Sequence, residues 1–343
     1  MSNQLPNANR QILLAARPSG EPQESNFRLV ESPVPEPGEG EALVRTLFLS
    51  VDPYMRGRMR DAKSYVAPVE LGAVMEGAVV GEVVRSNQSG LDTGDIVVGS
   101  LGWQDYAVAK PKQLHKLDPQ IHPISLGLGV LGMPGLTAYF GLLDLGQPKE
   151  GETVVVSAAS GAVGAVVGQI AKIKGCRVVG TAGSDAKVEY IMNELGFDAG
   201  INYKTAGHLG AALDAACPAG IDVYFDNVGG PITDAVMMRI NERARLVICG
   251  QISQYNAEKL EMGPRTLFQF VRMRARMEGF LIFDYAARYA EGREALGGWL
   301  ADGRLKYRED IMDGLENTPK AFLRMMRGEN FGKQVVHVAD PSA

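Results

Sequence analysis

The sequence predicts an α/β chain in which a β-rich domain is joined to a doubly wound, six-stranded parallel sheet. Short apolar runs separated by turn residues dominate the chain up to about residue 125, whereas strand-like and helix-like runs alternate after about residue 130. Frequent short strands indicate a barrel-like or partly open antiparallel fold. Regular alternation of strand and helix indicates right-handed crossovers and a parallel sheet.

Three segments in the first part of the chain have the composition of strands. Residues 41–51 are EALVRTLFLSV, residues 72–84 are GAVMEGAVVGEVV, and residues 95–109 are DIVVGSLGWQDYAVA. Turn-forming pairs such as Ser89-Gly90 lie between them. This part carries no nucleotide-binding signature of its own.

The second part contains apolar cores for six strands, at residues 154–156, 177–181, 200–203, 222–225, 245–250 and 279–283. Amphipathic stretches such as AVVGQIAKIKG (165–175) and KVEYIMNELG (187–196) lie between most of them and predict helices. A further helix is expected around residues 286–301, and the tail ends in another strand-like run. We therefore expect one domain over residues 1–128, completed by residues 304–343, and a second over residues 129–303.

Composition excludes several classes of function. The chain has 343 residues, 45% of them hydrophobic, and its 40 acidic residues outnumber 35 basic ones, which argues against a nucleic-acid partner. Cys176, Cys217 and Cys249 form no CxxC pair, and the first ten residues do not resemble a secretory signal, so we expect a cytoplasmic protein. Residues 123–143 carry no charge, but two prolines and five glycines argue against a membrane-spanning helix.

The segment after the first strand of the second part resembles a dinucleotide-binding turn. Residues 159–164 are ASGAVG, which follows the pattern G-x-G-x-x-G with alanine at the first position. Gly161 would let a pyrophosphate approach the backbone, and Gly164 would allow close packing of helix against strand. The following helix would direct its unpaired N–H groups and its positive dipole end at an anion. A Rossmann domain that binds a dinucleotide is therefore predicted, with a simple tight turn as the alternative.

The next strand bears on which dinucleotide is bound. No acidic residue ends this strand, where NAD-binding domains place a carboxylate on the ribose. Lys187 would lie one turn into the following helix, where a cation could meet a 2′-phosphate, so the pattern favours NADPH/NADP. Two alternatives stay open: Lys187 is a solvated surface charge, or Asp185 binds the ribose of NAD.

Four longer motifs carry a family resemblance over nearly the whole chain. Residues 50–59 (SVDPYMRGRM), 132–176, 225–230 (FDNVGG) and 249–256 (CGQISQYN) resemble medium-chain reductases that lack zinc. Within them the chain is similar to the branch of prostaglandin and leukotriene B4 reductases, alkenal double-bond reductases and NADPH-dependent curcumin reductase. The resemblance implies a GroES-like catalytic domain closed by the C-terminal tail, a Rossmann domain, and a homodimer.

The resemblance also implies a set of cofactor contacts. Residues of the phosphate turn, the adenosine end, the ribose and nicotinamide loops, the tail and the domain junction are expected to bind NADPH: Gly161, Ala162, Val163, Gly164, Lys187, Tyr203, Asn227, Cys249, Gly250, Gln251, Ile252, Ser253, Tyr255, Phe280, Leu281, Ile282, Asn330, Met133 and Thr137. For Met133 and Thr137, ordinary helix packing is the alternative.

No metal site is expected. Where zinc-dependent relatives place a cysteine and a His-Glu pair, this chain has Asp52 and Glu76 without the cysteine or the histidine. The four histidines are scattered, and none forms a recognisable triad with a nucleophile.

Without a metal, hydride transfer to a double bond conjugated to a carbonyl is the reaction that the protein can assist most directly. A donor aimed at the carbonyl oxygen would stabilise the enolate that forms. Tyr255 is the expected donor, because its loop follows the fifth strand of the predicted sheet and a phenol is protonated at neutral pH. Tyr54 is a second candidate, for lining the substrate site. The alternatives are a tyrosine that packs a loop and an aromatic residue of a strand core.

The predicted function is NADPH-dependent reduction of α,β-unsaturated ketones and aldehydes, with curcumin-like or 15-oxoprostaglandin-like substrates. Hydride would add at the β-carbon and a proton at the α-carbon. A quinone oxidoreductase and a non-catalytic NADPH-binding protein of the same fold remain alternatives. The expected partner is a small unsaturated carbonyl compound, with no nucleic acid and no membrane.

Overall fold

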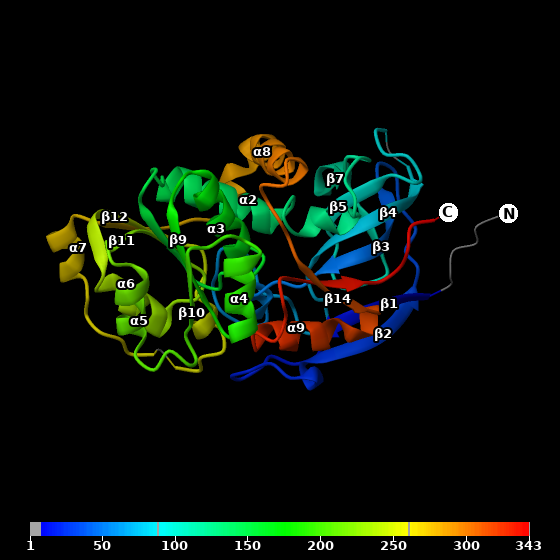
Figure 1. Ribbon diagram of the computed structural model, residues 1–343. Helices are drawn as coiled ribbons and strands as arrows, with labels where there is room; N and C mark the ends of the chain where they lie inside the picture. The colour runs from blue at the N-terminus through cyan, green and yellow to red at the C-terminus, as the bar shows by residue number, and fades with distance from the viewer. Residues whose placement is uncertain (1–7, 88, 260, 343) are drawn as a thin grey trace. The chain divides into compact units, whose positions relative to one another are not determined.

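The computed structural model describes residues 8–87, 89–259 and 261–342 (Figure 1). The chain divides into two compact units. The first contains the chain up to Leu128, Glu309–Asn330 and Gln334 onward, and the second contains Gly129–Arg308 and Phe331–Lys333. Each unit has its own sheet and its own buried core.

The first unit is built on antiparallel strands. Within its described residues a seven-stranded sheet has the order β14-β15-β3-β4-β5-β7, with β6 paired to β3, and β1 and β2 form a separate pair. The strands are β1 (Ala8–Leu14), β2 (Phe27–Pro33), β3 (Ala42–Ser50), β4 (Ala78–Ser86), β5 (Ile96–Ser100), β6 (Tyr106–Ala109), β7 (Leu114–Lys116), β14 (Glu309–Asp313) and β15 (Lys333–His337). The tail thus supplies two strands of a sheet that the first third of the chain begins.

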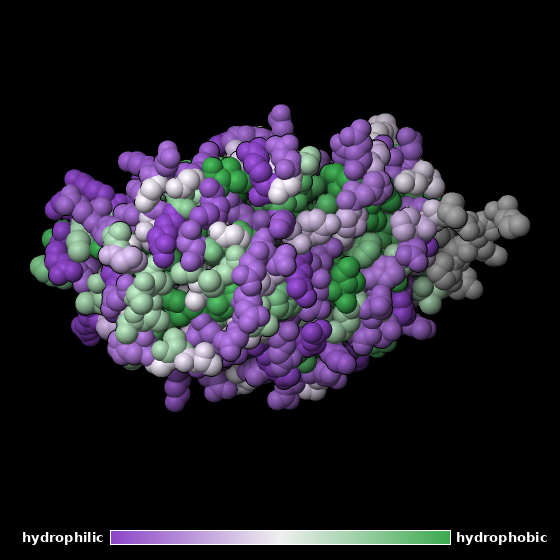
Figure 2. All heavy atoms as spheres, viewed as in Figure 1, coloured by the Kyte–Doolittle hydropathy of each residue, from purple (hydrophilic) through white to green (hydrophobic). Residues whose placement is uncertain are grey.

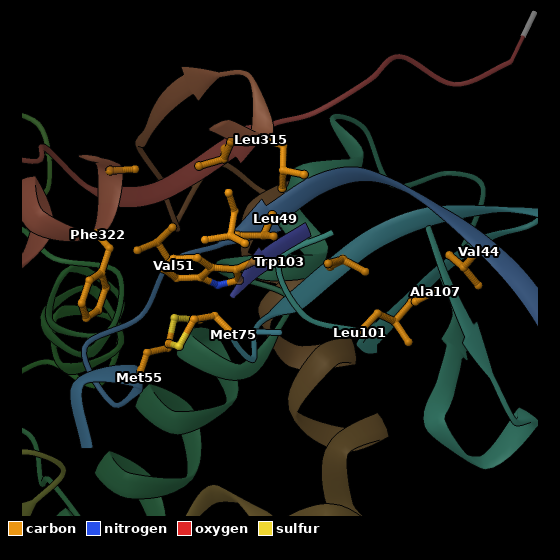
Figure 3. Packing of buried hydrophobic residues seen from close by; sticks show 14 of the residues in the cluster. Val44, Leu49, Val51, Met55, Met75, Leu101, Trp103, Ala107, Leu315 and Phe322 are labelled. Carbon is orange, nitrogen blue, oxygen red and sulfur yellow. The ribbon is translucent and has the colours of Figure 1, made fainter. Parts of the chain in front are cut away.

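The core of this unit centres on a fully buried tryptophan. Trp103 stacks on Phe27 with ring centroids 5.4 Å apart and meets the edge of Phe322 at 6.0 Å. Figure 3 shows Val51, Met55 and Met75 gathered around the same indole. Phe322 lies on α9 (Thr318–Met326), so the C-terminal helix supplies part of the core.

Short helices and turns connect these strands. They are η1 (Glu24–Asn26), α1 (Met55–Arg58), η2 (Pro111–Gln113), η3 (Ile124–Leu128) and η7 (Leu315–Asn317). β1 and β2 are absent from the sequence-based prediction, because their buried positions do not alternate regularly. The predicted strand over residues 95–109 divides into β5 and β6.

The second unit confirms the predicted parallel sheet. Within its described residues six strands have the order β10-β9-β8-β11-β12-β13. They are β8 (Thr153–Val156), β9 (Arg177–Ala182), β10 (Ala199–Asn202), β11 (Ile221–Asp226), β12 (Ile240–Ile248) and β13 (Arg276–Gly279), and every pairing between them is parallel. The strand order reverses between β8 and β11, where ligands bind in sheets of this kind.

Helices follow most strands of this sheet, as expected for right-handed crossovers. The helices of this unit are α2 (Met133–Phe140) and η4 (Gly141–Gly146), which precede β8, and then α3 (Gly164–Ile173), α4 (Asp185–Asn193), α5 (Leu209–Ala216), α6 (Gly230–Met237), η5 (Ile252–Gln254), α7 (Phe268–Met273), η6 (Ile282–Arg288) and α8 (Tyr289–Ala301). The uncharged segment 123–143 is divided among η3, α2 and η4. Throughout the described part of the chain, each helix is too short or too polar to cross a bilayer.

One predicted strand is wrong in its position. The sixth strand was expected over residues 279–283, but β13 covers Arg276–Gly279 and η6 begins at Ile282. The ladder with β12 ends at the pair Ile248–Gly279, and the ring of Phe280 then packs against Gly141, where an added Cβ would lie 2.5 Å from Phe280 Cζ. Phe280 therefore packs its ring against Gly141 of η4 and does not continue the strand.

Candidate active site

The turn between β8 and α3 has the compact geometry that its sequence predicts. Ala158 adopts a left-handed conformation with φ of +50°, and its carbonyl accepts the N–H of Gly161 at 2.9 Å. The N–H of Ala159 donates to the carbonyl of Thr181 on β9 at 3.0 Å. A Cβ at Gly164 would lie 2.4 Å from the Ala158 oxygen, so only glycine fits where α3 begins.

The start of α3 has the features that anion sites share. The main-chain N–H groups of Ala162, Val163 and Gly164 donate to no acceptor among the described residues, and residues 161–163 are half-exposed. α3 is a ten-residue helix with no acidic residue in its first turn. Its dipole and these N–H groups together favour a negatively charged ligand, and a diphosphate fits that requirement.

Two further predicted residues, Lys187 and Tyr203, lie just after the ends of β9 and β10. Ser184 caps α4 by accepting the N–H of Lys187 at 3.4 Å, which fixes the backbone of Lys187 in the first turn. Tyr203 follows β10, and its hydroxyl lies 3.0 Å from the Cβ position of Gly183. The carboxylate of Asp185 accepts the side-chain N–H of Asn202 at 2.7 Å and is therefore engaged within the protein.

The loop after β12 brings the CGQISQYN motif next to the loop after β11. The N–H groups of Cys249 and Gly250 donate to the main-chain oxygen of Asp226 at 2.9 and 3.1 Å. Ser253 Oγ donates to the carbonyl of Val228 at 2.6 Å. The segment Cys249–Tyr255 and residue Asn227, predicted separately from sequence, thus form one neighbourhood.

Tyr255 lies at the end of η5 in that neighbourhood. Its phenol oxygen accepts the N–H of Gln251 at 3.4 Å, so this bond does not use the hydroxyl proton. The Cβ position of Gly250 is 3.1 Å from the same oxygen, so the hydroxyl lies directly over the backbone that follows β12.

Burial raises the pKa of the nearby Cys249 thiol to about 12, which keeps this thiol protonated and unreactive at neutral pH.

The other predicted contacts of the second unit lie on α2 and after β13. Thr137 Oγ1 donates to the carbonyl of Met133 at 2.7 Å, a bond within the helix. Phe280 also meets Tyr285 edge-on with ring centroids 6.3 Å apart, which fixes the segment that continues through Leu281 and Ile282. Tyr54 and Asn330 belong to the first unit.

Tyr54 lies beside a buried ion pair in the first unit. Arg58 is 4% exposed, donates to Glu76 Oε1 at 2.7 Å, and lies 5.7 Å from the ring centre of Tyr54. Burial raises the pKa of the Tyr54 phenol, and the nearby carboxylates of Asp52 and Glu76 raise it further. Burial likewise raises the pKa of Glu76, although Arg58 opposes this shift.

The two carboxylates that the sequence offers near the expected zinc-ligand positions, Asp52 and Glu76, are both engaged within the protein. Asp52 accepts the hydroxyl of Ser50, and Glu76 is paired with Arg58. In the ranges that the structure describes, no group of three or more His, Cys, Asp and Glu side chains is arranged to hold a metal ion. The expectation of a metal-free site stays a prediction.

Sequence reasoning missed Ser157, Asp226 and Arg58. Ser157 and Asp226 follow apolar strand runs, and polar residues at that place are a usable signal for a site. The sequence could not show that these two side chains bond each other across 69 positions. Arg58 lies in the quoted motif SVDPYMRGRM, but its partner Glu76 comes from a different segment.

Comparisons with known proteins find relatives that cover nearly the whole chain. A family described as "N-terminal domain of oxidoreductase" matches residues 10–117, and one described as "Zinc-binding dehydrogenase" matches residues 162–296. The NADPH-dependent curcumin reductase of Escherichia coli (strain K12) is 50% identical, over 96% of this chain and 97% of its own length. The NADP(+)-dependent 2-alkenal reductase of Nicotiana tabacum is 44% identical, over 97% of this chain and 98% of its own length.

A solved structure gives the same result for the fold. The crystal structure of CurA in complex with NADPH from Vibrio vulnificus superposes with a TM-score of 0.93 at 49% identity, covering 97% of this chain and 100% of that one. Fold and site together define a two-unit nucleotide-dependent oxidoreductase. The chain belongs to the medium-chain dehydrogenase/reductase family, in its prostaglandin reductase and curcumin reductase branch.

The two glycines of the turn provide a test of its geometry. Gly164→Ala should lower the free energy of unfolding by about 1–3 kcal/mol, the usual cost of forcing backbone and side chains apart in a packed site. Gly161→Ala is the matched control, because its Cβ would lie 3.2 Å from the Ala158 oxygen, a contact that a small shift relieves. Urea-induced unfolding followed by circular dichroism measures both. An equal loss of unfolding free energy in the two variants would contradict the close contact at Gly164.

Proposed function

We propose that this chain reduces the carbon–carbon double bond of α,β-unsaturated aldehydes and ketones with NADPH. The observation that carries the proposal is the similarity, over nearly the whole chain, to proteins named for curcumin reduction and 2-alkenal reduction. The second unit supplies a turn and helix start that fit a diphosphate. We further propose that the first unit, with the tail, forms the catalytic domain, and that the second is the cofactor-binding domain.

The residues of the second unit fit NADPH at several places. The half-exposed turn at residues 161–163 and the N–H groups at the start of α3 would hold the diphosphate. Lys187 and Tyr203 would face the 2′-phosphate of the adenosine, where a cation is favoured. Asn227, Cys249–Tyr255 and Phe280–Ile282 would line the ribose and the nicotinamide.

Bound NADPH supplies a hydride, and the protein determines where that hydride goes. The β-carbon of the substrate forms the new C–H bond, the π electrons of the double bond move toward the carbonyl, and negative charge develops on the carbonyl oxygen. Tyr255 would donate its hydroxyl hydrogen bond to that oxygen and so stabilise the enolate. A proton from water then adds at the α-carbon and completes the saturated product. Tyr54 stays a second candidate for contact with the substrate.

We also propose that the protein is a homodimer. β13 is an edge strand with one open side, and all four of its residues are exposed. Phe268 and Val271 on α7 are 74% and 70% exposed, and Met277 on β13 is 42% exposed. Hydrophilic residues predominate on the face in Figure 2, but apolar spheres are visible at the end where Figure 1 places α7. An open strand edge beside exposed apolar side chains suits pairing with a second copy.

The reaction is tested with a substrate panel of enones, alkenals, quinones and a diarylheptanoid, with NADPH or NADH as reductant. Wild-type protein should oxidise NADPH with enones and alkenals and yield the saturated carbonyl product by mass spectrometry. Tyr255→Phe should lower kcat by about 10²–10³-fold, the usual cost of losing one such donor, with the dissociation constant for NADPH nearly unchanged. Tyr139→Phe, which removes a hydroxyl bonded to Glu291, is the control. Turnover with quinones alone, or none with any substrate, would reject the proposal.

Cofactor choice is tested with Lys187→Ala. Loss of a charge-assisted contact to the 2′-phosphate should raise the dissociation constant for NADPH about tenfold or more, and that for NADH less than twofold. Fluorescence titration of each coenzyme measures these constants. Lys174→Ala, at the opposite end of α3, is the control and should leave both unchanged. An equal loss of affinity for NADPH and NADH would show that Lys187 does not contact the 2′-phosphate.

The dimer is tested with Val271→Asp. A carboxylate on the exposed face of α7 should prevent burial of that face, so the mass measured by light scattering should fall from two chains to one. Leu71→Asp, at a 56% exposed position of the first unit, is the control and should keep the wild-type mass. A wild-type mass of one chain would overturn this proposal.

A further inference from the structure

The point where the strand order reverses is built around one buried carboxylate. β8 pairs with β9 on one side and with β11 on the other, so the crevice for ligands opens between the carboxyl ends of β8 and β11. Ser157 directly follows β8, and Asp226 is the last residue of β11. Both side chains are fully buried, and they meet at this crevice.

Five donors surround the carboxylate of Asp226. Its Oδ1 accepts from Ser157 Oγ at 3.1 Å, Tyr224 Oη at 2.9 Å, and the N–H groups of Val228 and Gly229 at 2.9 Å each. Its Oδ2 accepts from Thr233 Oγ1 at 2.6 Å. Burying a carboxylate without hydrogen-bond partners costs much free energy. The five donors therefore hold the carboxylate in place, and the carboxylate holds the donors in place. Two of the donors are backbone groups of the loop after β11, so Asp226 determines the shape of that loop.

Ser157 links this carboxylate to Asn227. The Ser157 hydroxyl donates to Asp226 and accepts the main-chain N–H of Asn227 at 2.8 Å. Asn227 Nδ2 then donates to the carbonyl of Ser157 at 2.8 Å. Both the backbone and the side-chain amide of Asn227 are therefore held, and its Oδ1, which accepts no hydrogen bond from any described group, is left to a ligand.

The main chain of Asp226 also holds the second loop of the site. Its carbonyl oxygen accepts the N–H groups of Cys249 and Gly250, which begin the segment that carries Tyr255. Gly229, with φ of +74°, brings the first loop against the second, and its Cβ position is 3.1 Å from Gln251 Cβ. One residue thus joins both loops that the proposed function assigns to the nicotinamide end of NADPH.

We propose that Asp226 is a positioning residue, which through Ser157 orients Asn227 so that its Oδ1 accepts a hydrogen bond from the ribose or carboxamide of NADPH. This inference rests on the proposed function for the identity of the ligand. Asp226 itself is fully buried beneath the loop, so its effect on the ligand is exerted through these contacts. Its effect is exerted on the ribose and nicotinamide end, at the opposite end of the cofactor site from Lys187.

The test is a double-mutant cycle on the dissociation constant for NADPH, measured by fluorescence titration without substrate. Asp226→Asn replaces one acceptor oxygen with a donor that faces other donors, and it should raise the constant about tenfold. Asn227→Ala should raise it by a similar factor. Because Asp226 acts through Asn227, adding Asp226→Asn to the Asn227→Ala variant should change the constant less than threefold.

Asp222→Asn is the matched control. Asp222 lies at the other end of β11 and accepts the N–H of Thr153 and of Asn241 Nδ2, both at 2.8 Å. This variant should lower thermal stability but leave the NADPH constant within twofold of wild type. If Asp226→Asn does not fold, Ser157→Ala decides in its place, because it removes the link to Asn227. Ser157→Ala should likewise raise the NADPH dissociation constant about tenfold.

Three outcomes would overturn the inference, all of them in the NADPH dissociation constant. In the first, the factors for Asp226→Asn and Asn227→Ala multiply in the double variant. In the second, the constant is unchanged by Asp226→Asn or by Ser157→Ala, and in the third, Asp226→Asn and Asp222→Asn change it equally. The proposed function fails separately, if the wild-type protein binds NADPH but reduces none of the panel substrates. A cycle that behaves as expected would then still assign Asp226 its positioning role.

Discussion

The site of the second unit depends on the close approach of α3 to the backbone that precedes it. Gly164 begins the helix with its Cα against the carbonyl of Ala158, a space that no side chain could share. This contact fixes the direction of α3, and the direction determines where the first N–H groups point. Ala158 adopts its left-handed conformation at the same turn, so the backbone is strained where the site requires a sharp bend.

Packing beneath the turn supports that approach. Gly168 on α3 faces the ring of Phe197, where an added Cβ would lie 1.8 Å from Cζ, and Gly180 on β9 lies beneath Ala159 and Ile191. Small residues on the helix and the strand thus let both come close to the sheet core. On the far side of β8, Asp226 fixes the loops that follow β11 and β12. The second unit therefore combines a turn whose backbone geometry suits a diphosphate with a polar network at the reversal of strand order.

The first unit is held by different means. Trp103, Phe27 and Phe322 bring three distant parts of the chain into one core, and the C-terminal tail is needed for it. Arg58 is buried between the rings of Tyr54 and Tyr65 and has Glu76 as its ion-pair partner, which offsets the cost of removing its charge from water. Tyr54 and the segment around Tyr65 are packed against that arginine.

Local patterns in the sequence determined the class of the fold and the location of the phosphate turn. The β-branched run at 154–156 and the apolar core at 177–181 predict buried parallel strands, and ASGAVG at 159–164 predicts the turn, because these features depend on neighbours in the chain. Local patterns do not determine where an element begins and ends, as the shift of the sixth strand from 279–283 to Arg276–Gly279 shows. An apolar residue can belong to a strand or to a packed loop.

Only the tertiary structure decided which distant residues meet. Ser157 and Asp226 lie 69 positions apart, and Arg58 and Glu76 lie 18 positions apart. A hydrogen bond between such residues exists only after sheet order and register are set, and neither is encoded by spacing in the chain. The sequence alone therefore determined a tight turn between strand and helix whose pattern predicts nucleotide binding, whereas the folded chain decided which buried carboxylate holds the loops after β11 and β12.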